Sequence, residues 1–409
     1  MGLPLEGIRV CDLTIVFAGP ICTSILADLG AEVIKIENIN ARGTHNAVAR
    51  SAGADEGRPY NRVANFHELN RGKRGITLNL MQPEAKEAFL RLVRISDIVI
   101  ENFSPRVMRN FGLDYEALRK ENPELIMVSM PAMGGTGPFA NRIAFGPGID
   151  ALSGMCHLTG FADGPPTKPG HVLGDFNAGL SAAYAVMTAL HAKRRTGKGQ
   201  HIEISMREGQ TFLIGDFLTD ASMNNRSPMR QGNRDSSMAP HGVYPCSGED
   251  EWVAIAVGSD EKWQKLRSLM GDPEWARDSR FATVTGRYGH QDEIDRELSV
   301  WTGNHSADEV MNLLQGAGVA AGVVANGRSL AGDPHYLSRD FVRPVPTPEA
   351  GVLQLARPGF SLTKTPAVLK AAPNFGADND AVLGELLGFS REEIRHMEEV
   401  KAISREPVE

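Results

Sequence analysis

Short apolar runs alternate with helical patterns through the first third of the chain, and this alternation limits the possible folds more than any other feature. The runs 8–13 (IRVCDL) and 32–37 (EVIKIE) predict buried strands, with Pro20 and Gly30 marking the ends of a helix between them. Further strands are expected at 75–80, 98–100, 125–130 and 201–205, and helices at 83–96, 115–120 and 178–194. This order predicts a doubly wound, Rossmann-like α/β domain with a parallel sheet and right-handed crossovers.

A second domain is expected because 409 residues exceed the usual size of one domain. The polar segment 224–235 (NNRSPMRQGNRD) has the composition of a linker. The chain beyond it predicts strands at 252–257 and 319–324 and helices at 261–270, 292–302 and 307–315. We therefore predict a large α/β domain from residues 1–222 and 330–409 and a small α+β domain from residues 225–328.

Composition excludes several classes of partner. Hydrophobic residues make up 42% of the chain and charged residues 23%, and the net charge of −7 provides no attraction to nucleic acid or anionic membranes. No run of 18 apolar residues predicts a membrane span, and no signal peptide is apparent. The four cysteines are far apart without a CxxC pair, which predicts neither a metal site nor disulfides and favours a cytoplasmic location.

The first strand-to-helix turn does not have the sequence of a dinucleotide site. Residues 18–20 (AGP) lack the G-x-G-x-x-G motif, and Pro20 has no backbone N–H for a pyrophosphate. NAD is therefore not expected as a cofactor.

A compact basic turn at 70–74 (NRGKR) is a candidate phosphate site. Arg71 and Lys73 could form charge-assisted hydrogen bonds to a phosphorylated ligand. The alternative is an ordinary solvated turn, and the turn alone does not decide between them.

The segment 101–106 (ENFSPR) follows a predicted strand directly, and ligands of open α/β sheets bind beyond the carboxyl ends of strands. Asn102 and Phe103 could contact an adenine there, and Arg106 could bind a phosphate. The alternative is a plain strand-to-helix loop with Phe103 in the core.

Asp175 stands before a long apolar helix, in the small-residue segment 174–179 (GDFNAG). An aspartate at such a place is commonly an N-cap. It could also be a carboxylate nucleophile that attacks an activated acyl group, with Gly174 and Gly179 leaving room for a bulky thioester. The residues alone leave both readings open.

Taken together, the motifs resemble the class III CoA-transferase family, which includes formyl-CoA transferase, the carnitine CoA-transferases and the 2-methylacyl-CoA racemases. The order and spacing of the motifs make the match specific over nearly the whole chain. They are LPLEGIRVCDLT at 3–14, AGP at 18–20, ADLGAEVIKIE at 27–37, LNRGKRGITLNL at 69–80, SDIVIENFSP at 96–105, LGDFNAG at 173–179, RRTGKGQHIEISM at 194–206 and DPHYLSRDF at 333–341.

The resemblance implies a CoA-transferase that moves CoA from an acyl-CoA to a free carboxylic acid through covalent aspartyl intermediates. Asp175 matches the catalytic aspartate, Lys73 a lysine that contacts the CoA phosphates, and Asn102, Phe103 and Met206 residues that line the CoA site. No permanently bound cofactor is implied, because CoA is a substrate. The family also implies an intertwined homodimer, or a heteromer with a paralogous subunit.

Several positions depart from the family pattern. Asn38 replaces an arginine near the nucleotide, a loss that Arg42 or Arg71 would have to offset. Phe145 stands where the racemases have an acid/base histidine, and an apolar ring cannot transfer a proton, so racemase or epimerase activity is the weaker alternative. A non-catalytic subunit is disfavoured because Asp175 is retained.

The acyl pocket is expected to be apolar. Phe17 occupies the position of an active-site glutamine, and together with Phe145 and Phe176 it predicts an acyl group larger than formyl or oxalyl, such as an aromatic or branched mono- or dicarboxylic acid. Backbone N–H groups of the glycine-rich segment 134–137 are expected to stabilise oxyanions.

Overall fold

The computed structural model describes residues 2–42 and 58–408 and divides the chain into two compact units. The larger unit comprises the chain up to residue 155, residues 168–225 and the chain from 334 onward. The smaller unit comprises residues 156–167 and 226–333. Residues 156–167, which the sequence analysis assigned to the large domain, therefore belong to the smaller unit.

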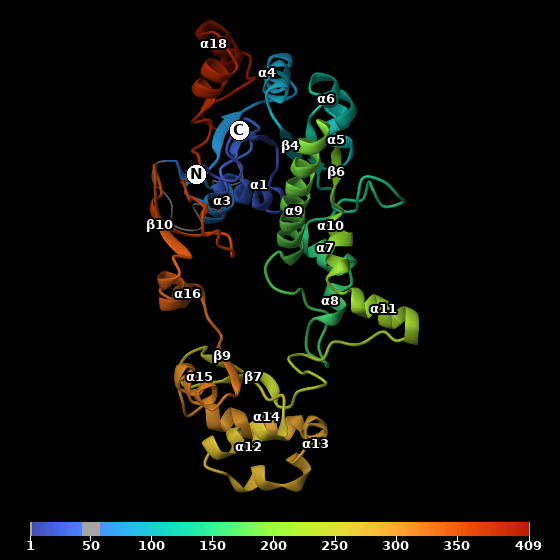
Figure 1. Ribbon diagram of the computed structural model, residues 1–409, viewed down its shortest axis with the longest axis vertical. Coiled ribbons are helices and arrows are strands. Elements are labelled where there is room, and N and C mark those ends of the chain that lie inside the picture. The colour runs from blue at the N-terminus through green and yellow to red at the C-terminus, as the bar shows by residue number, and fades with distance from the viewer. Residues whose placement is uncertain (1, 43–57, 409) are drawn as a thin grey trace. The chain divides into compact units, whose positions relative to one another are not determined.

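A six-stranded parallel sheet forms the centre of the larger unit, in the order β3–β2–β1–β4–β5–β6 (Figure 1). The strands are β1 (Arg9–Asp12), β2 (Glu32–Glu37), β3 (Arg74–Thr77), β4 (Ile98–Glu101), β5 (Ile126–Ser129) and β6 (His201–Glu203). β1 pairs with both β2 and β4, so the strand order reverses beside it. The predicted doubly wound α/β fold is confirmed, and its switch point lies between β1 and β4.

Successive side chains of each strand enter different hydrophobic cores, because both faces of a parallel sheet are covered. Val10 packs with one core and Cys11 with the other, as do Ile98 and Val99. One face is covered by α1 (Ala18–Asp28) and α9 (Leu173–Thr196). The other is covered by α4 (Pro83–Arg94), α5 (Arg106–Phe111), α6 (Tyr115–Glu121), the π-helical η4 (Asp380–Leu386) and α18 (Arg391–Glu399).

Helices α1 and α9 approach each other closely at Gly179. A Cβ atom added there would lie 2.6 Å from the carbonyl oxygen of Ala18 and 2.8 Å from the Cβ of Ile21. Only glycine allows this approach, which brings the first turn of α1 against the N-terminal part of α9.

Shorter elements complete the larger unit around its sheet. They are η1 (Pro59–Asn61), α3 (Ala64–Asn70), α7 (Gly146–Leu152), α10 (Met206–Phe212), α11 (Gly215–Asn224), α17 (Pro334–Ser338) and the hairpin β10 (Val342–Thr347) and β11 (Gly351–Ala356). In the described part of the chain, none of the helices combines the length and apolar character needed to span a membrane.

The smaller unit is α+β, with an antiparallel sheet in the order β7–β8–β9. Its core gathers around Trp263, whose ring contacts those of Trp275 and Phe281. Its elements are β7 (His241–Pro245), β8 (Trp252–Ala256), β9 (Ala320–Val323), α12 (Asp260–Leu269), η2 (Glu274–Arg277), η3 (Ser279–Phe281), α13 (Val284–Gly289), α14 (Gln291–Thr302), α15 (Ala307–Gly316) and α16 (Gly327–Ala331). The short helix α8 (Met155–Leu158) begins at the boundary between the units.

Candidate active site

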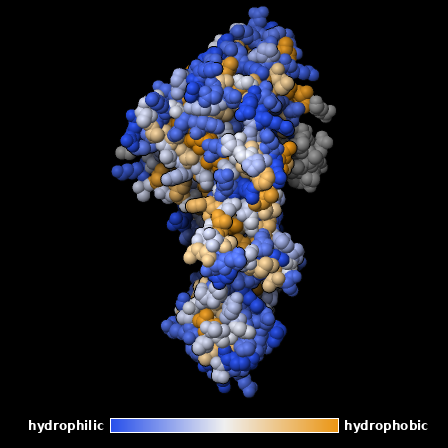
Figure 2. Space-filling view, turned by 90° about the vertical axis from the view of Figure 1, so that its right-hand side faces the viewer, coloured by the Kyte–Doolittle hydropathy of each residue, from blue (hydrophilic) through white to orange (hydrophobic). Residues whose placement is uncertain are grey.

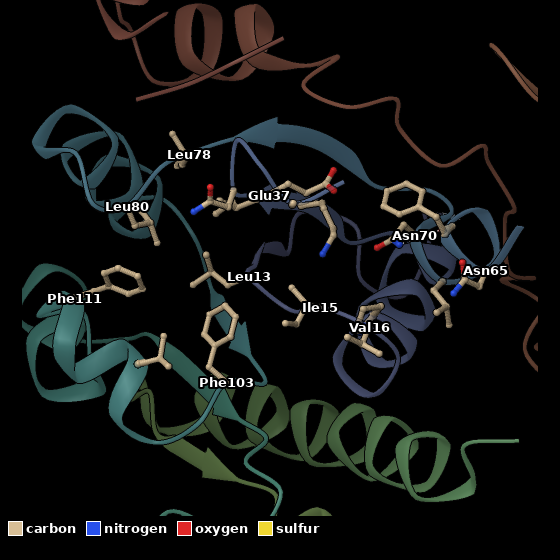
Figure 3. A pocket seen from close by; sticks show the side chains of 18 residues that line it. Leu13, Ile15, Val16, Glu37, Asn65, Asn70, Leu78, Leu80, Phe103 and Phe111 are labelled. Carbon is tan, nitrogen blue, oxygen red and sulfur yellow. Dashed lines mark hydrogen bonds between the residues drawn. The ribbon is translucent and has the colours of Figure 1, made fainter. Parts of the chain in front are cut away.

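A cavity of about 530 Å³ opens beyond the carboxyl ends of β1, β2, β3 and β4, at the switch point of the sheet. Figure 3 shows Ile15 near its centre, Phe103 and Phe111 toward one side, and Asn65 and Asn70 toward the other. Most of its lining is apolar, and ring edges and aliphatic side chains of this kind suit a flat heterocycle.

A second cavity, of about 340 Å³, adjoins the first and contains Asp175. The two cavities share Ile15, Val16, Phe103 and Val107 in their walls, so they form one elongated site. Six residues predicted from the sequence line the second cavity: Phe17, Asn102, Phe103, Phe145, Asp175 and Met206.

Asp175 is the third residue of α9, inside its first turn, and is not the N-cap. Val172 occupies the N-cap position in a left-handed conformation (φ 41°) and offers no side-chain cap. The backbone N–H groups of Asp175 itself and of Ala18, the first residue of α1, lie close enough to the Asp175 carboxylate to stabilise its negative charge. A Cβ atom added to Gly146 would lie 2.3 Å from Asp175 Oδ2, so the carboxylate also packs against the first residue of α7.

The carboxylate of Asp175 is buried, with 8% of the residue exposed. Burial raises its pKa to about 6, and the negative charge of Asp150 adds to the increase. The backbone N–H of Ala18 and the charge of His171 lower the pKa of Asp175 but do not cancel its rise. The group is therefore mostly ionised at neutral pH and poorly solvated, which suits a nucleophile.

Asn102 holds the loop after β1 in place. Its Oδ1 accepts from the Ile15 backbone N–H and its Nδ2 donates to the Ile15 carbonyl, both at 2.8 Å. The next residue, Val16, has a φ of 65°, which is strained for a β-branched residue. Asn102 thus shapes the wall between the two cavities through the backbone of this loop.

Lys73 lies inside the protein and lines neither cavity. Its side chain is fully buried in an ion pair with Asp12, with Nζ 2.9 Å from Asp12 Oδ2. Nζ also donates to Asn70 Oδ1 at 2.8 Å and to the Pro20 carbonyl at 3.4 Å. This placement gives Lys73 a structural part instead of the direct phosphate contact expected from the sequence.

The other predicted cations also lie away from the cavity walls. Arg71 is buried in an ion pair with Asp28 (2.7 Å), and Arg106 is exposed at the start of α5. Arg42, proposed as a substitute for the arginine missing at Asn38, is buried against Glu37 at 2.6 Å. The predicted pocket residue Phe176 is 40% exposed and does not line the Asp175 cavity.

Two cations that the sequence analysis missed do line the cavities. Lys35 lines the larger cavity, where its Nζ donates to the Thr14 carbonyl, and Arg142 lines the Asp175 cavity. The Arg142 guanidinium lies 3.9 Å from the centre of the Phe139 ring. Neither residue stands in a basic cluster or beside a strand end, so no sequence pattern identified it.

The glycine-rich segment 134–137 does not line the Asp175 cavity, and its expected oxyanion role is corrected. Gly135 packs against Glu203, since a Cβ atom there would lie 2.1 Å from Glu203 Oε2. Thr136 and Gly137 line a separate groove beside α10 and α11. The backbone N–H that the structure directs at Asp175 from another helix belongs to Ala18.

The fold agrees with the comparison of the sequence to known families. The model of CoA-transferase family III matches residues 5–379. The chain belongs to this family. It is therefore a class III CoA-transferase, as its resemblance implied.

Curated relatives of this CoA-transferase cover it nearly end to end. It is 33% identical to the succinyl-CoA–D-citramalate CoA-transferase of Chloroflexus aurantiacus, over 98% of both chains. It is 32% identical to the succinate–glutarate CoA-transferase of Agrobacterium fabrum, over 95% of this chain and 97% of that one. Among solved structures, a CaiB/BaiF family protein from Brucella suis matches with a TM-score of 0.84 and 31% identity, covering 94% of this chain and 100% of that one.

Removing the charge of Lys73 is expected to destabilise this CoA-transferase. Lys73→Met keeps the bulk of the side chain but leaves buried Asp12 without its ion-pair partner, and breaking such a pair costs about 3–5 kcal/mol. Urea denaturation at pH 7 measures the change in the free energy of unfolding. The matched control, Lys198→Met on an exposed turn, should change it by less than about 0.5 kcal/mol. A stable Lys73→Met variant with weakened CoA binding would instead support a direct phosphate contact.

Proposed function

We propose that this enzyme transfers CoA from an acyl-CoA donor to a free carboxylic acid through covalent intermediates on Asp175. The observation that carries the proposal is the buried carboxylate of Asp175, with its pKa raised to about 6, at one end of two connected cavities. A carboxylate in this state is ionised at neutral pH and weakly stabilised by its surroundings, as an acyl-accepting nucleophile requires.

In this proposal the nucleotide end of CoA occupies the larger cavity and the thioester lies beside Asp175. The shared wall at Ile15, Val16 and Phe103 would contact the pantetheine arm between them. Phe103 and Phe111 offer rings on which an adenine can stack. Lys35 is the cation that lines this cavity within the described residues and is our candidate for a phosphate contact.

The chemistry begins with attack of an Asp175 carboxylate oxygen on the thioester carbonyl. Collapse of the tetrahedral intermediate breaks the C–S bond, giving a mixed anhydride on Asp175 and CoA thiolate. The thiolate then attacks the aspartyl carbonyl, releases the donor carboxylate and leaves CoA as an aspartyl thioester. The acceptor carboxylate reverses these two steps, so Asp175 is regenerated and no redox chemistry is involved.

The N-terminus of α1 is positioned to stabilise the negative charge that develops in these steps. Its first N–H, from Ala18, stabilises the charge of the Asp175 carboxylate, and Phe17 at the N-cap position provides no side-chain cap that would compete. Helix N-termini favour negative charge through their free N–H groups and the helix dipole. The same N–H groups are our candidates for the oxyanion site.

We further propose that one substrate is a short dicarboxylic acid. Arg142 lines the cavity that holds Asp175, where it can pair with a carboxylate at the far end of the acyl chain. The names of the two relatives above contain succinate, glutarate and citramalate, which all carry a second carboxylate. The apolar rings of Phe17 and Phe145 would flank the carbon chain between the two charges.

Racemisation at the α-carbon is the weaker alternative for this site. Phe145 lines the Asp175 cavity and cannot exchange a proton. Both relatives are named as CoA-transferases, which favours the same conclusion.

A homodimer is proposed as the functional assembly. The outward face of α9 carries Phe176, Leu180, Tyr184 and Met187 at successive turns, with exposures of 39–77%. Exposed apolar residues continue on α10 and α11. Helix α11 lies on the right of Figure 1, and this side of the molecule faces the viewer in Figure 2. The face shown in Figure 2 carries hydrophobic patches. Contiguous apolar surface of this kind suits a second copy of the chain.

Asp175→Asn should abolish transfer without weakening the fold. The amide keeps an acceptor for the Ala18 N–H but cannot attack a thioester, so turnover should fall by about four orders of magnitude or more. Because the pKa of Asp175 is raised in the folded protein, its ionisation lowers the free energy of unfolding as the pH increases through about 4 to 6. The uncharged variant should therefore be at least as stable as wild type at pH 7. Acyl-CoA assays and urea denaturation measure the two effects. Full transferase activity in a folded variant would exclude Asp175 as the nucleophile.

Arg142→Gln should discriminate between acceptor acids. Loss of a charge-assisted hydrogen bond of about 1.5 kcal/mol should lower kcat/KM for succinate or glutarate about tenfold, mainly through KM. The kcat/KM for a monocarboxylic acid of similar length should be unchanged. Arg195→Gln, at the exposed end of α9, provides the matched control. Equal losses for both classes of acid would argue against Arg142 as the recognition group.

The dimer should persist at high dilution. Mass photometry at nanomolar concentration is expected to give twice the mass of one chain, because an interface that buries the apolar face of α9 dissociates slowly. A population of single chains under these conditions would contradict the proposal.

A further inference from the structure

Asp150, on α7, is a buried carboxylate that the mechanism above does not use. Only 1% of the residue is exposed, and its Oδ1 accepts a hydrogen bond of 2.6 Å from Gln210 Nε2 on α10. Its Oδ2 is buried and finds no hydrogen-bond partner among the described residues, and the same holds for Gln210 Oε1. Burying a carboxylate with so few partners is costly, so its presence calls for a physical reason.

The Asp150–Gln210 pair lies against the turn that carries Asp175. A Cβ atom added to Gly174, the preceding residue, would lie 2.5 Å from Gln210 Oε1 and 3.3 Å from Asp150 Oδ1. Gly146, one turn before Asp150 on α7, packs against the Asp175 carboxylate. Helices α7, α9 and α10 therefore hold the two carboxylates close together at fixed positions.

The groups that act on Asp175 come from every element packed around it. Helix α7 contributes the negative charge of Asp150, the segment before α9 contributes His171, and α1 contributes the Ala18 N–H. Helix α10 contributes the uncharged Gln210. Burial and Asp150 together raise the pKa of Asp175 to about 6, so Asp150 is the specific side chain that opposes the free carboxylate.

We propose that Asp150 is a positioning residue for covalent transfer: its buried charge, held by Gln210, destabilises the free Asp175 carboxylate and so favours the acylated enzyme. The inference rests on the function proposed above. It assigns to Asp150 a part of the free-energy difference between the free and CoA-loaded states of Asp175, beside the part that comes from burial.

The charge balance of the first half-reaction explains how this works. Asp175–COO⁻ and acyl-CoA give the aspartyl–CoA thioester and a free carboxylate, which departs with the negative charge. The C–S bond of the donor breaks, a new C–S bond forms on Asp175, and one carboxylate oxygen of Asp175 leaves in the released acid. Asp175 is neutral in the product, so its repulsion with Asp150 is present only before the reaction.

Thermodynamic linkage makes this proposal quantitative. Protonation and acylation both remove the charge of Asp175, so one repulsion governs both equilibria. Removing the charge of Asp150 should lower the pKa of Asp175 and lower the acylation equilibrium constant by matching factors. A pKa that is lower by one unit corresponds to an equilibrium constant about tenfold smaller.

Asp150→Asn tests this, because it is isosteric and keeps an acceptor for Gln210. The full-length protein is mixed with succinyl-CoA over a pH series, and intact mass spectrometry with peptide mapping measures the fraction of Asp175 that carries CoA. In the variant we expect the midpoint of the pH dependence of CoA loading to move to lower pH. We also expect the acylation equilibrium constant at the high-pH plateau to fall by the factor that corresponds to this shift in pKa. Asp308→Asn, an exposed carboxylate on α15 of the smaller unit, removes the same formal charge and should change neither quantity.

A merely structural role would lower the amount of adduct without this matched shift in pH, and that result would overturn the proposal. So would a folded Asp150→Asn variant with both quantities unchanged. If circular dichroism finds Asp150→Asn unfolded, Asp150→Ser, which keeps a hydroxyl for Gln210, provides the same comparison. Absence of any CoA adduct on wild-type Asp175 would instead count against the proposed function, so the two failures are distinguishable.

Discussion

The buried ion pair between Asp12 and Lys73 is the interaction on which the geometry of the active site depends. Asp12 ends β1, and besides Lys73 it accepts hydrogen bonds from the backbone N–H of Thr14 (2.9 Å) and the hydroxyl of Thr23 on α1 (2.7 Å). Burial alone would raise the pKa of Asp12, but the charges of Lys73 and Lys35 hold it well below its usual range. One carboxylate therefore fixes the strand end, the loop that follows and the start of α1.

The strained backbone at Val16 and the close helix contact at Gly179 follow from this ion pair. The loop after Thr14 carries Val16 in a left-handed conformation, which the surrounding hydrogen bonds must enforce because a valine does not adopt it freely. Asn102 holds the same loop from β4. As a result, α1 begins at Ala18, whose N–H stabilises the charge of Asp175, and Gly179 lets α9 approach α1 closely.

The sequence predicted the fold well because parallel strands buried on both faces appear as continuous apolar runs, such as 32–37, which coincides with β2. The predicted helix began five residues after the observed start of α9, since Gly174 and Asp175 in its first turn are poor helix formers, and this made Asp175 resemble an N-cap. The ion-pair partners of the buried cations could not be predicted for a different reason. Lys73 and Arg71 pair with carboxylates 61 and 43 residues earlier in the chain, and no local pattern reveals such partners.

The remaining constraint on the site is water. In the proposed mechanism a mixed anhydride on Asp175 would hydrolyse if water reached it, so the apolar lining around Asp175 would protect that intermediate as well as bind substrate. Within one chain this protection is incomplete, because Phe145 lines the Asp175 cavity and is 72% exposed. Under the proposed function and assembly, bound CoA and the apolar surface of a second copy of the chain would cover the site during turnover. The same exclusion of water strengthens the repulsion between Asp150 and Asp175, so the condition that protects the intermediate also favours its formation.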